Sequence, residues 1–265
     1  MHVITLTTDF GTPDWFVATM KGVILGVNPR AIVVDITHEI PAGDIRAGAF
    51  SLAASCRSFP EGTVHVAVVD PGVGSARSAI AVQTLDYFFV GPDNGVLSWA
   101  LRSEEIRTIR RLENEKLFRQ PVSRTFHGRD VFAPVAAHLS KGLSIAKVGS
   151  EQSDYQRLSW PEAKRGRRRV AGEVIYIDRF GNAITNIDAQ SLLASDWDRG
   201  RVCVGRRVIR GLKRFYQQAP EGEPLAIIAS TGFLEIAINA GSAAGRLKIR
   251  PGDPVTLQRP IRYTS

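Results

Sequence analysis

One stretch of the sequence, Thr63 to Arg77, constrains the fold more than any other. It reads TVHVAVVDPGVGSAR, a run of mostly β-branched residues that stops at a Pro-Gly-Val-Gly turn. Such an unbroken apolar run is typical of a strand covered on both faces, as in the middle of a parallel sheet. Pro and Gly end the strand and let the backbone turn tightly. Asp70 is therefore predicted to lie at the carboxyl end of a central strand, where open α/β sheets bind their ligands.

Further carboxylates follow predicted strands in the same way. Asp9, Asp35 and Asp93 each come directly after a short apolar run or its first turn. Four carboxylates on one edge of a sheet favour a polar ligand site over coincidence. Arg77 follows Asp70 closely enough to fold back over its carboxylate. Taken alone, a structural ion pair between these two side chains is the simpler interpretation.

The first part of the chain alternates predicted strands with helical patterns. The strands are expected at 3–6, 32–34, 63–69, 80–84 and 87–90, with the second and third of them buried. Asp14 and Asp44 are expected to cap the first two helices, and Asp130 to lie at the N-terminus of a later one. This order predicts an α/β domain with a largely parallel sheet over residues 1–160.

The composition changes towards the C-terminus. Residues 161–169 contain the basic run KRGRRR and are interpreted as a linker. Short strands with Gly-rich turns then follow, at 170–177, 201–209, 225–229, 247–249 and 255–258. This pattern predicts a smaller antiparallel β-barrel domain over residues 170–265.

The net charge of +8 raises the question of an anionic partner. Much of the excess is local, in Lys164–Arg169 and in a second group of arginines and lysines between 201 and 214. No zinc-finger, RNP or Walker pattern accompanies these residues. A solvated basic surface is the simpler interpretation, so no specific nucleic-acid partner is expected. Nucleic-acid binding through Lys164–Arg169 stays open as an alternative, with strongly salt-dependent affinity as its signature.

The remaining composition argues for an ordinary globular protein. Hydrophobic residues make up 44% of the chain and charged residues 23%. No apolar run approaches the length of a membrane span, and no charged-then-apolar leader opens the sequence, so we expect a cytoplasmic protein without a membrane partner. Cys56 and Cys203 are far apart and indicate neither a disulfide framework nor a metal site.

Three polar motifs complete the candidates. His127 stands in TFHGRD, before a predicted helix whose N-terminus disfavours the cationic imidazole. Asp178–Asn182, DRFGN, puts a carboxylate, an aromatic ring and an amide around one tight turn. Ser230–Ala240 adds further polar groups and another aromatic side chain. In isolation, turn chemistry is the simpler interpretation of the last two motifs.

Together these motifs resemble one family, the adenosine-forming S-adenosylmethionine (SAM) hydrolases, also called SAM hydroxide adenosyltransferases. They are related to the fluorinase and chlorinase. The motifs are LTTDFG, IVVDITHEI, VAVVDPGVG…R, GPDNG, TFHGRD, IDRFGNAITNI and STGFLEIAINAGSAAG. The resemblance covers nearly the whole chain in order. It implies an N-terminal α/β domain, a C-terminal β-barrel and a homotrimer with the site at the subunit interface.

The resemblance also implies the reaction, hydrolysis of SAM to adenosine and L-methionine by in-line attack of water on C5′. SAM is then the substrate, and no cofactor is expected. Asp70, Arg77 and His127 match the three residues that hold the attacking water in the hydrolases. On chemical grounds both Asp70 and His127 can accept a proton from this water, and His127 is the preferred eventual acceptor. The halogenases have an aromatic residue at the position of Asp70, and a carboxylate there would repel a halide.

Other positions match substrate-binding groups of the family. They are Asp9 for the ribose hydroxyls, and Asp178, Phe180, Asn182, Ser230, Phe233, Glu235 and Ala240 for the methionine and adenine. One position departs from the halogenases, which have Arg where Thr231 stands here. The methionine carboxylate is therefore expected to bind hydroxyls and backbone amides.

A metal-dependent phosphohydrolase is the second alternative that the residues leave open. It would gather a carboxylate and imidazole set around divalent ions, drawn from Asp9, Asp35, His38, Asp70 and His127. Since no ligand set with metal spacing appears in the sequence, a metal-independent enzyme is expected.

Overall fold

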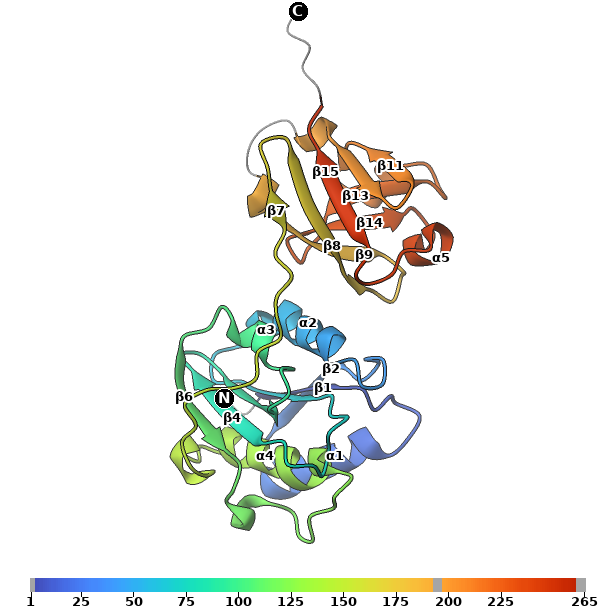
Figure 1. The fold of residues 1–265 in the computed structure, drawn as a ribbon. Helices are drawn as coiled ribbons and strands as arrows, with labels where there is room; N and C mark the ends of the chain where they lie inside the picture. The colour runs from blue at the N-terminus through green and yellow to red at the C-terminus, as the bar shows by residue number, and fades with distance from the viewer. Residues whose placement is uncertain (1–2, 193–196, 261–265) are drawn as a thin grey trace, which may run out of the picture. The chain divides into compact units, whose positions relative to one another are not determined.

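The computed structural model describes residues 3–192 and 197–260 and divides the chain into two compact units, residues 1–159 and 160–265. The first is an α/β unit and the second a barrel-like β unit (Figure 1). The predicted fold class is confirmed. Within the described part of the chain, no helix has the length and apolar character needed to cross a membrane.

A six-stranded mixed sheet forms the centre of the first unit, in the order β2-β1-β3-β5-β4-β6. The strands are β1 (Val3–Thr8), β2 (Ile32–Thr37), β3 (Val64–Val68), β4 (Ala79–Thr84), β5 (Phe88–Pro92) and β6 (Ile106–Arg111). The pairs β2–β1, β1–β3 and β3–β5 are parallel, whereas β4 runs antiparallel to both β5 and β6. Every residue of β3 is buried, as its unbroken Val-rich sequence predicts.

Helices cover both faces of this sheet, α1 with α4 on one side and α2 with α3 on the other (Figure 1). They are α1 (Phe16–Val27), α2 (Ile45–Ser55), α3 (Ser98–Leu101) and α4 (Ala133–Ser140). Short helical turns span Cys56–Ser58, Glu115–Leu117, Gly128–Phe132 and Ile145–Lys147. Asp44 caps α2 as predicted, with Oδ1 accepting from the Ala47 amide at 2.9 Å. The predicted cap by Asp14 is wrong, because Trp15 occupies the N-cap position of α1 and no side chain bonds there.

Strand β2 also differs from the prediction. It is an edge strand with β1 as its one sheet neighbour, and Ile32 at its start is 59% exposed. Asp35 lies inside β2, opposite Leu6, rather than beyond its end. A three-residue Val-rich run has too short a pattern to distinguish an edge strand from a central one.

The second unit is built on a nine-stranded sheet that is largely antiparallel and barrel-like. The strands run in the order β11-β10-β15-β8-β9-β14-β13-β12, with β7 beside β8 and with β12 and β13 parallel. They are β7 (Lys164–Arg165), β8 (Arg169–Ile177), β9 (Ala183–Asp188), β10 (Arg201–Val204), β11 (Arg207–Arg210), β12 (Leu212–Lys213), β13 (Pro224–Ile228), β14 (Phe233–Ile238) and β15 (Pro254–Gln258). Short helical turns span Gln190–Leu192, Trp197–Arg199 and Tyr216–Gln218, and α5 covers Ala243–Leu247.

The second unit differs from the predicted strands in several places. Part of the expected linker, Lys164–Arg165, is a strand paired with β8. The expected strand at 201–209 is a hairpin, β10 and β11, that turns at Gly205 with a φ of 53°. The segment expected as a strand at 247–249 begins at the last residue of α5. The sequence analysis did not predict β9, which directly follows the Asp178–Asn182 motif, or β14, which lies within the Ser230–Ala240 motif.

Candidate active site

Two of the predicted carboxylates lie at one edge of the first unit's sheet. Asp9 follows β1 directly and Asp70 comes two residues after β3, and these two parallel strands are neighbours. The Gly43 amide donates to Asp9 Oδ2 at 2.8 Å. A Cβ atom on Gly43 would lie 3.9 Å from Cβ of Pro71, the residue after Asp70. The Gly43 loop therefore lies next to both the Asp9 loop and the Asp70 loop.

Arg77 joins Asp70 to His127. Its Nε donates to Asp70 Oδ1 at 2.9 Å, and its Nη2 bonds both Asp70 Oδ2 and His127 Nδ1, the latter at 2.9 Å. The side chains of Asp70 and Arg77 are only 4% and 11% exposed. A guanidinium has donors and no acceptor, so Nδ1 of His127 accepts and the neutral imidazole carries its proton on Nε2. The structure thus brings the three predicted residues together.

The surroundings favour a neutral His127. Burial lowers the pKa of His127, the charge of Arg77 lowers it further, and the carboxylates of Asp70 and Asp130 act in the opposite direction. The net shift is downward from an ordinary value near 6.5. The Arg77 guanidinium also lies over the Phe132 ring, 5.4 Å from its centroid.

Two glycines allow the loops around this cluster to touch. Gly74 has a φ of 76°, and a Cβ atom there would lie 2.2 Å from the Arg124 carbonyl oxygen. The loop after β3 thus packs against the segment that leads to His127. A Cβ atom on Gly128 would lie 3.2 Å from the Phe10 ring. Residues next to His127 and Asp9 are therefore in contact, and a side chain at either glycine would push the loops apart.

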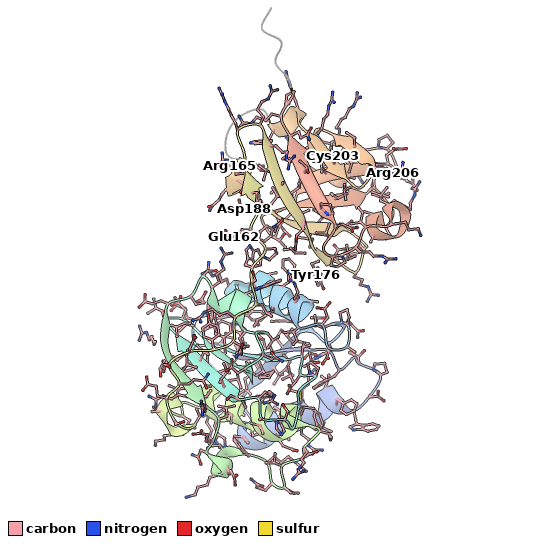
Figure 2. The ribbon with its side chains drawn as sticks, viewed as in Figure 1. Glu162, Arg165, Tyr176, Asp188, Cys203 and Arg206 are labelled. Carbon is pink, nitrogen blue, oxygen red and sulfur yellow. The ribbon has the colours of Figure 1, made fainter. Side chains whose placement is uncertain are left out.

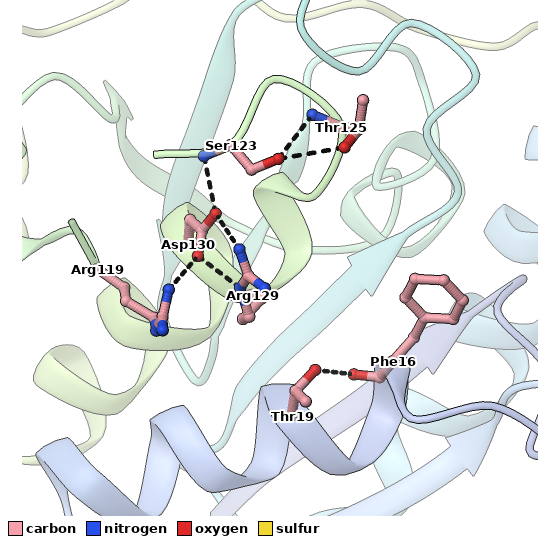
Figure 3. Close-up of polar contacts among 7 residues, drawn as sticks. All are labelled: Phe16, Thr19, Arg119, Ser123, Thr125, Arg129 and Asp130. Carbon is pink, nitrogen blue, oxygen red and sulfur yellow. Dashed lines mark hydrogen bonds and ion pairs between the residues drawn. The ribbon is translucent and has the colours of Figure 1, made fainter. Parts of the chain in front are cut away.

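The segment that carries His127 is fastened by Asp130, whose side chain is fully buried (Figure 3). Its Oδ2 accepts from the Ser123 amide at 2.9 Å, while Arg129 binds both carboxylate oxygens and Arg119 approaches Oδ1 at 3.4 Å. Burial raises the pKa of Asp130, but the bonds from Arg129 and Ser123 outweigh this and hold it below its usual value. Asp130 lies in the helical turn Gly128–Phe132 directly before α4, close to the predicted helix N-terminus.

A pocket of about 330 Å³ adjoins this cluster. Arg77 and His127 contribute to its lining, together with apolar side chains such as Val122 and Val131 and the charged Arg111. Of the three clustered residues, Arg77 and His127 therefore border this pocket.

The other two strand-end carboxylates have partners of their own. Asp35 binds Lys21 at 2.5 Å and lies 3.0 Å from His38 Nε2. Asp93 accepts from Gln152 Nε2 at 3.0 Å and from the Gln156 amide at 2.7 Å. Because β2, β1, β3 and β5 are parallel neighbours, all four carboxylates lie towards the same edge of the sheet, as expected, but Asp35 and Asp93 are bound there by other groups. Among residues 3–192 and 197–260, no three His, Cys, Asp or Glu side chains form a group that could hold a metal ion.

The predicted residues of the second unit centre on one tight turn. Asp178 Oδ1 accepts from the amides of Phe180 and Asn182 at 2.9 and 2.8 Å, and Oδ2 accepts from Asn182 Nδ2 at 3.0 Å. Phe180, in the middle of this turn, is 75% exposed. Gly181 has a φ of 80°, and a Cβ atom there would overlap Ser242 Oγ at 2.0 Å. The turn therefore presents a carboxylate and an aromatic ring on a fixed backbone.

Glu235 has a partner that the sequence analysis missed. Its side chain is buried and accepts from the Tyr216 hydroxyl at 2.8 Å. Burial raises the pKa of Glu235, and burial together with the bond to Glu235 raises the pKa of Tyr216 to about 12. The charge of Asp178 contributes to both shifts, so the three side chains share one electrostatic environment. Tyr216 is remote in sequence and carries no local motif.

The remaining predicted residues of the second unit, Ser230, Phe233 and Ala240, lie near opposite ends of β14. Ser230 and Phe233 lie at its start, where Phe233 stands opposite Asp188 and packs on Trp160 at 5.7 Å between ring centroids. Ala240 follows its end, on the side where Ile236 stands opposite Ala183, next to the Asp178–Asn182 turn. Within this unit, the structure therefore brings Ala240 to the turn but not Ser230 and Phe233.

The contact between Arg77 and His127 predicts the direction of a pKa change. In Arg77→Met, loss of the guanidinium charge favours the imidazolium, and Asp70 is left to attract it. We expect the pKa of His127 to rise from its lowered value towards or above 6.5, measured by NMR titration of the imidazole Cε1 proton. His138, whose lowered pKa has burial and Lys141 as its causes, is the internal control and should not move. An unchanged pKa for His127 would contradict the contact.

Comparisons with known proteins agree with the fold and the motifs. The SAM hydroxide adenosyltransferase N-terminal domain matches residues 4–149, and the C-terminal domain of that family matches residues 172–256. The (R)-S-adenosyl-L-methionine hydrolase of Salinispora tropica is 41% identical over 253 residues, which cover 94% of this chain and 95% of that protein.

More distant and structural comparisons extend the same picture. A crystal structure of an uncharacterized conserved protein from Thermotoga maritima superposes with a TM-score of 0.90 at 39% identity, covering 97% of this chain and 100% of that one. A fluorinase of Actinoplanes sp. is 26% identical, with 97% of each chain covered. Because both domains of one family match in order over most of the sequence, this chain belongs to the SAM hydroxide adenosyltransferase family.

Proposed function

We propose that this protein hydrolyses SAM to adenosine and L-methionine by attack of water on C5′. The observation that carries the proposal is the Asp70–Arg77–His127 cluster, in which a carboxylate, a guanidinium and a neutral imidazole meet at the end of β3. The hydrolase name of the Salinispora tropica relative, which aligns over nearly the full length of both chains, supports it.

The chemistry of SAM suits a site of this kind. Methionine leaves the sulfonium as a neutral thioether, so its departure needs little assistance. What the reaction needs is a water molecule in line with the C5′–sulfur bond and the exclusion of competing water. Positioned hydrogen-bonding groups therefore supply the larger part of the catalysis.

The geometry assigns a role to each member of the cluster. Arg77 donates one hydrogen bond to each oxygen of Asp70. Each oxygen has a second lone pair, which can accept a hydrogen bond from the attacking water. His127 gives Nδ1 to Arg77, so its Nε2–H can donate to the oxygen of that water. In this arrangement Asp70 accepts the proton, in place of His127, the acceptor preferred from the sequence alone. The charge of Arg77 stabilises the developing hydroxide.

The substrate contacts involve both units. Asp9 Oδ2 accepts a hydrogen bond from the Gly43 amide, and Asp9 Oδ1 would accept hydrogen bonds from the ribose hydroxyls. The Asp178 carboxylate suits the methionine ammonium, and the exposed Phe180 ring suits stacking. Glu235 serves the site by fixing Tyr216. We place Ser230, Phe233 and Ala240 as further contacts of the methionine and adenine.

We also propose that the protein is a cytoplasmic homotrimer. Each site would combine Asp70 of one subunit with Asp178 of its neighbour. The division of the candidate groups between two compact units supports a shared site. No cofactor is required in this proposal, because the leaving group is already activated by the sulfonium charge.

The direct test is incubation of the protein with SAM, followed by chromatography for adenosine and methionine. Because the relative's name specifies the (R) form, each sulfonium epimer is assayed separately. We expect adenosine and methionine in equal amounts with a chelator present. S-adenosylhomocysteine with a methylated product would contradict the proposal. Loss of activity on chelation, with recovery on adding a divalent ion, would favour the metal-dependent alternative.

Substitutions at Asp70 and Asp9 should separate catalysis from binding. Asp70→Ala removes the water-orienting carboxylate and should slow single-turnover hydrolysis by about 100-fold, or about 3 kcal/mol, while SAM affinity changes little. Asp70→Asn keeps the shape of the side chain and should also be slow. Asp9→Ala should weaken SAM binding, because it removes contacts made in ground and transition states alike. Normal turnover in both Asp70 variants would disprove the water site.

Mixing two inactive variants tests the shared site. Asp70→Ala and Asp178→Ala subunits are mixed in equal amounts, unfolded and refolded together. In about a quarter of the sites, an intact Asp70 from one subunit then meets an intact Asp178 from its neighbour, and these sites should be active. Light scattering should give a mass three times that of one chain. A mixture with no more activity than its separate components, or an active monomer, would contradict the trimer proposal.

A further inference from the structure

The charge of this protein is distributed very unevenly between its two units. Residues 1–159 carry 16 lysines and arginines and 16 aspartates and glutamates. Residues 160–265 carry 18 basic and 10 acidic residues, so the whole net charge of +8 lies in the second unit. Charge asymmetry of this kind indicates an interaction with a polyanion.

The strand register gathers part of this charge into one row. Arg201 on β10 stands directly opposite Arg210 on β11 and opposite Gln258 on β15. Gln258 in turn stands opposite Arg169 on β8, so the row crosses four neighbouring strands, a width of about 14 Å. The next residues along these strands, such as Val202, lie in the core. The row therefore faces outward.

More cations flank this row. Lys164 lies on β7, Arg167 in the turn to β8, and Arg206 and Arg207 at the turn between β10 and β11. Figure 2 marks Arg206 and Cys203 on that hairpin and Arg165 on β7. We call the following set the basic face; all are exposed: Lys164, Arg167, Arg169, Arg201, Arg206, Arg207 and Arg210.

The basic face lies in three stretches without acidic residues, although Glu162, Glu173 and Asp253 lie just beyond them. Residues 163–171, 199–214 and 254–260 contain no Asp or Glu. Within the described ranges, none of its seven members forms an ion pair. Arg201 and Arg210 are like charges directly opposite each other, an arrangement that destabilises an antiparallel pair. A bound polyanion would relieve this repulsion.

We propose that the basic face binds nucleic acid through the phosphate backbone, without sequence preference. Six of its seven members are arginines, whose planar guanidinium matches phosphate oxygens bidentately. Contacts to phosphates position a nucleic acid but do not read its sequence. A membrane surface fits less well, because membrane-binding surfaces insert several apolar side chains into the lipid. Among the described residues of these strands, Val208 is the one large apolar side chain that is exposed.

The test uses fluorescence anisotropy with labelled short duplexes, two DNA duplexes of unrelated sequence and one RNA duplex. The variant Arg169→Gln/Arg201→Gln/Arg210→Gln removes the row. The control Arg30→Gln/Arg107→Gln/Lys147→Gln removes the same charge from exposed positions of the first unit. Thermal unfolding confirms that both variants are folded. Neither set includes a residue placed in the active site, so SAM hydrolysis is an independent readout.

We expect wild-type protein to bind the duplexes with affinity that falls steeply between about 50 and 200 mM salt. The row variant should bind at least about 10-fold more weakly, and its salt slope should be less steep by about one for each phosphate that it no longer neutralises. The control should bind within about threefold of wild type, since the three charges that it removes are spread over the first unit, which has no net charge, and lie away from the basic face. The two DNA sequences should bind equally.

Three results would overturn the proposal. Equal weakening in the row variant and the control would show that net charge, not the basic face, determines binding. No binding of wild-type protein to any duplex at the lowest salt would exclude a nucleic-acid surface. Binding to phosphatidylserine vesicles without binding to the duplexes would assign the basic face to a membrane.

Discussion

The bridge that Arg77 makes between Asp70 and His127 is the interaction on which the first unit's candidate site depends. It fixes the carboxylate on two oxygens and fixes the imidazole by its Nδ1 atom. The guanidinium can reach both because β3 ends just before Asp70 and because Gly74 lets the following loop lie on the Arg124 carbonyl. The end of β3 and the glycine turn after it therefore hold Asp70, Arg77 and His127 in fixed positions before any substrate binds.

Charge is used differently in the two units. In the first unit, buried carboxylates such as Asp70 and Asp130 are each bound by arginines, and the unit carries no net charge. In the second unit, Arg201 and Arg210 face each other across two strands and form no ion pair among the described residues, while the candidate substrate groups lie at the Asp178 turn and Glu235. The proposed reaction and the proposed nucleic-acid surface thus rest on separate residues and can be tested separately.

The sequence predicted what local pattern determines and missed what depends on distant pairing. The β-branched run of β3 placed Asp70 correctly because burial on both faces leaves a continuous apolar pattern. The local sequence pattern predicted an ion pair between Arg77 and Asp70 but did not predict a contact with His127. The grouping of all three residues came from the resemblance to a known family. Tyr216 was missed because its bond to Glu235 spans elements that no local motif connects. The strand pairing of Lys164 was hidden by its composition, which is typical of a linker.

The central claim is that water held by the Asp70 cluster attacks C5′ of SAM. The most direct measurement is a single turnover in water enriched in heavy oxygen, with mass spectrometry of both products. Attack at C5′ predicts one heavy oxygen atom in the 5′-hydroxyl of adenosine and none in methionine. Unlabelled adenosine, or heavy oxygen in methionine, would contradict this account of the site.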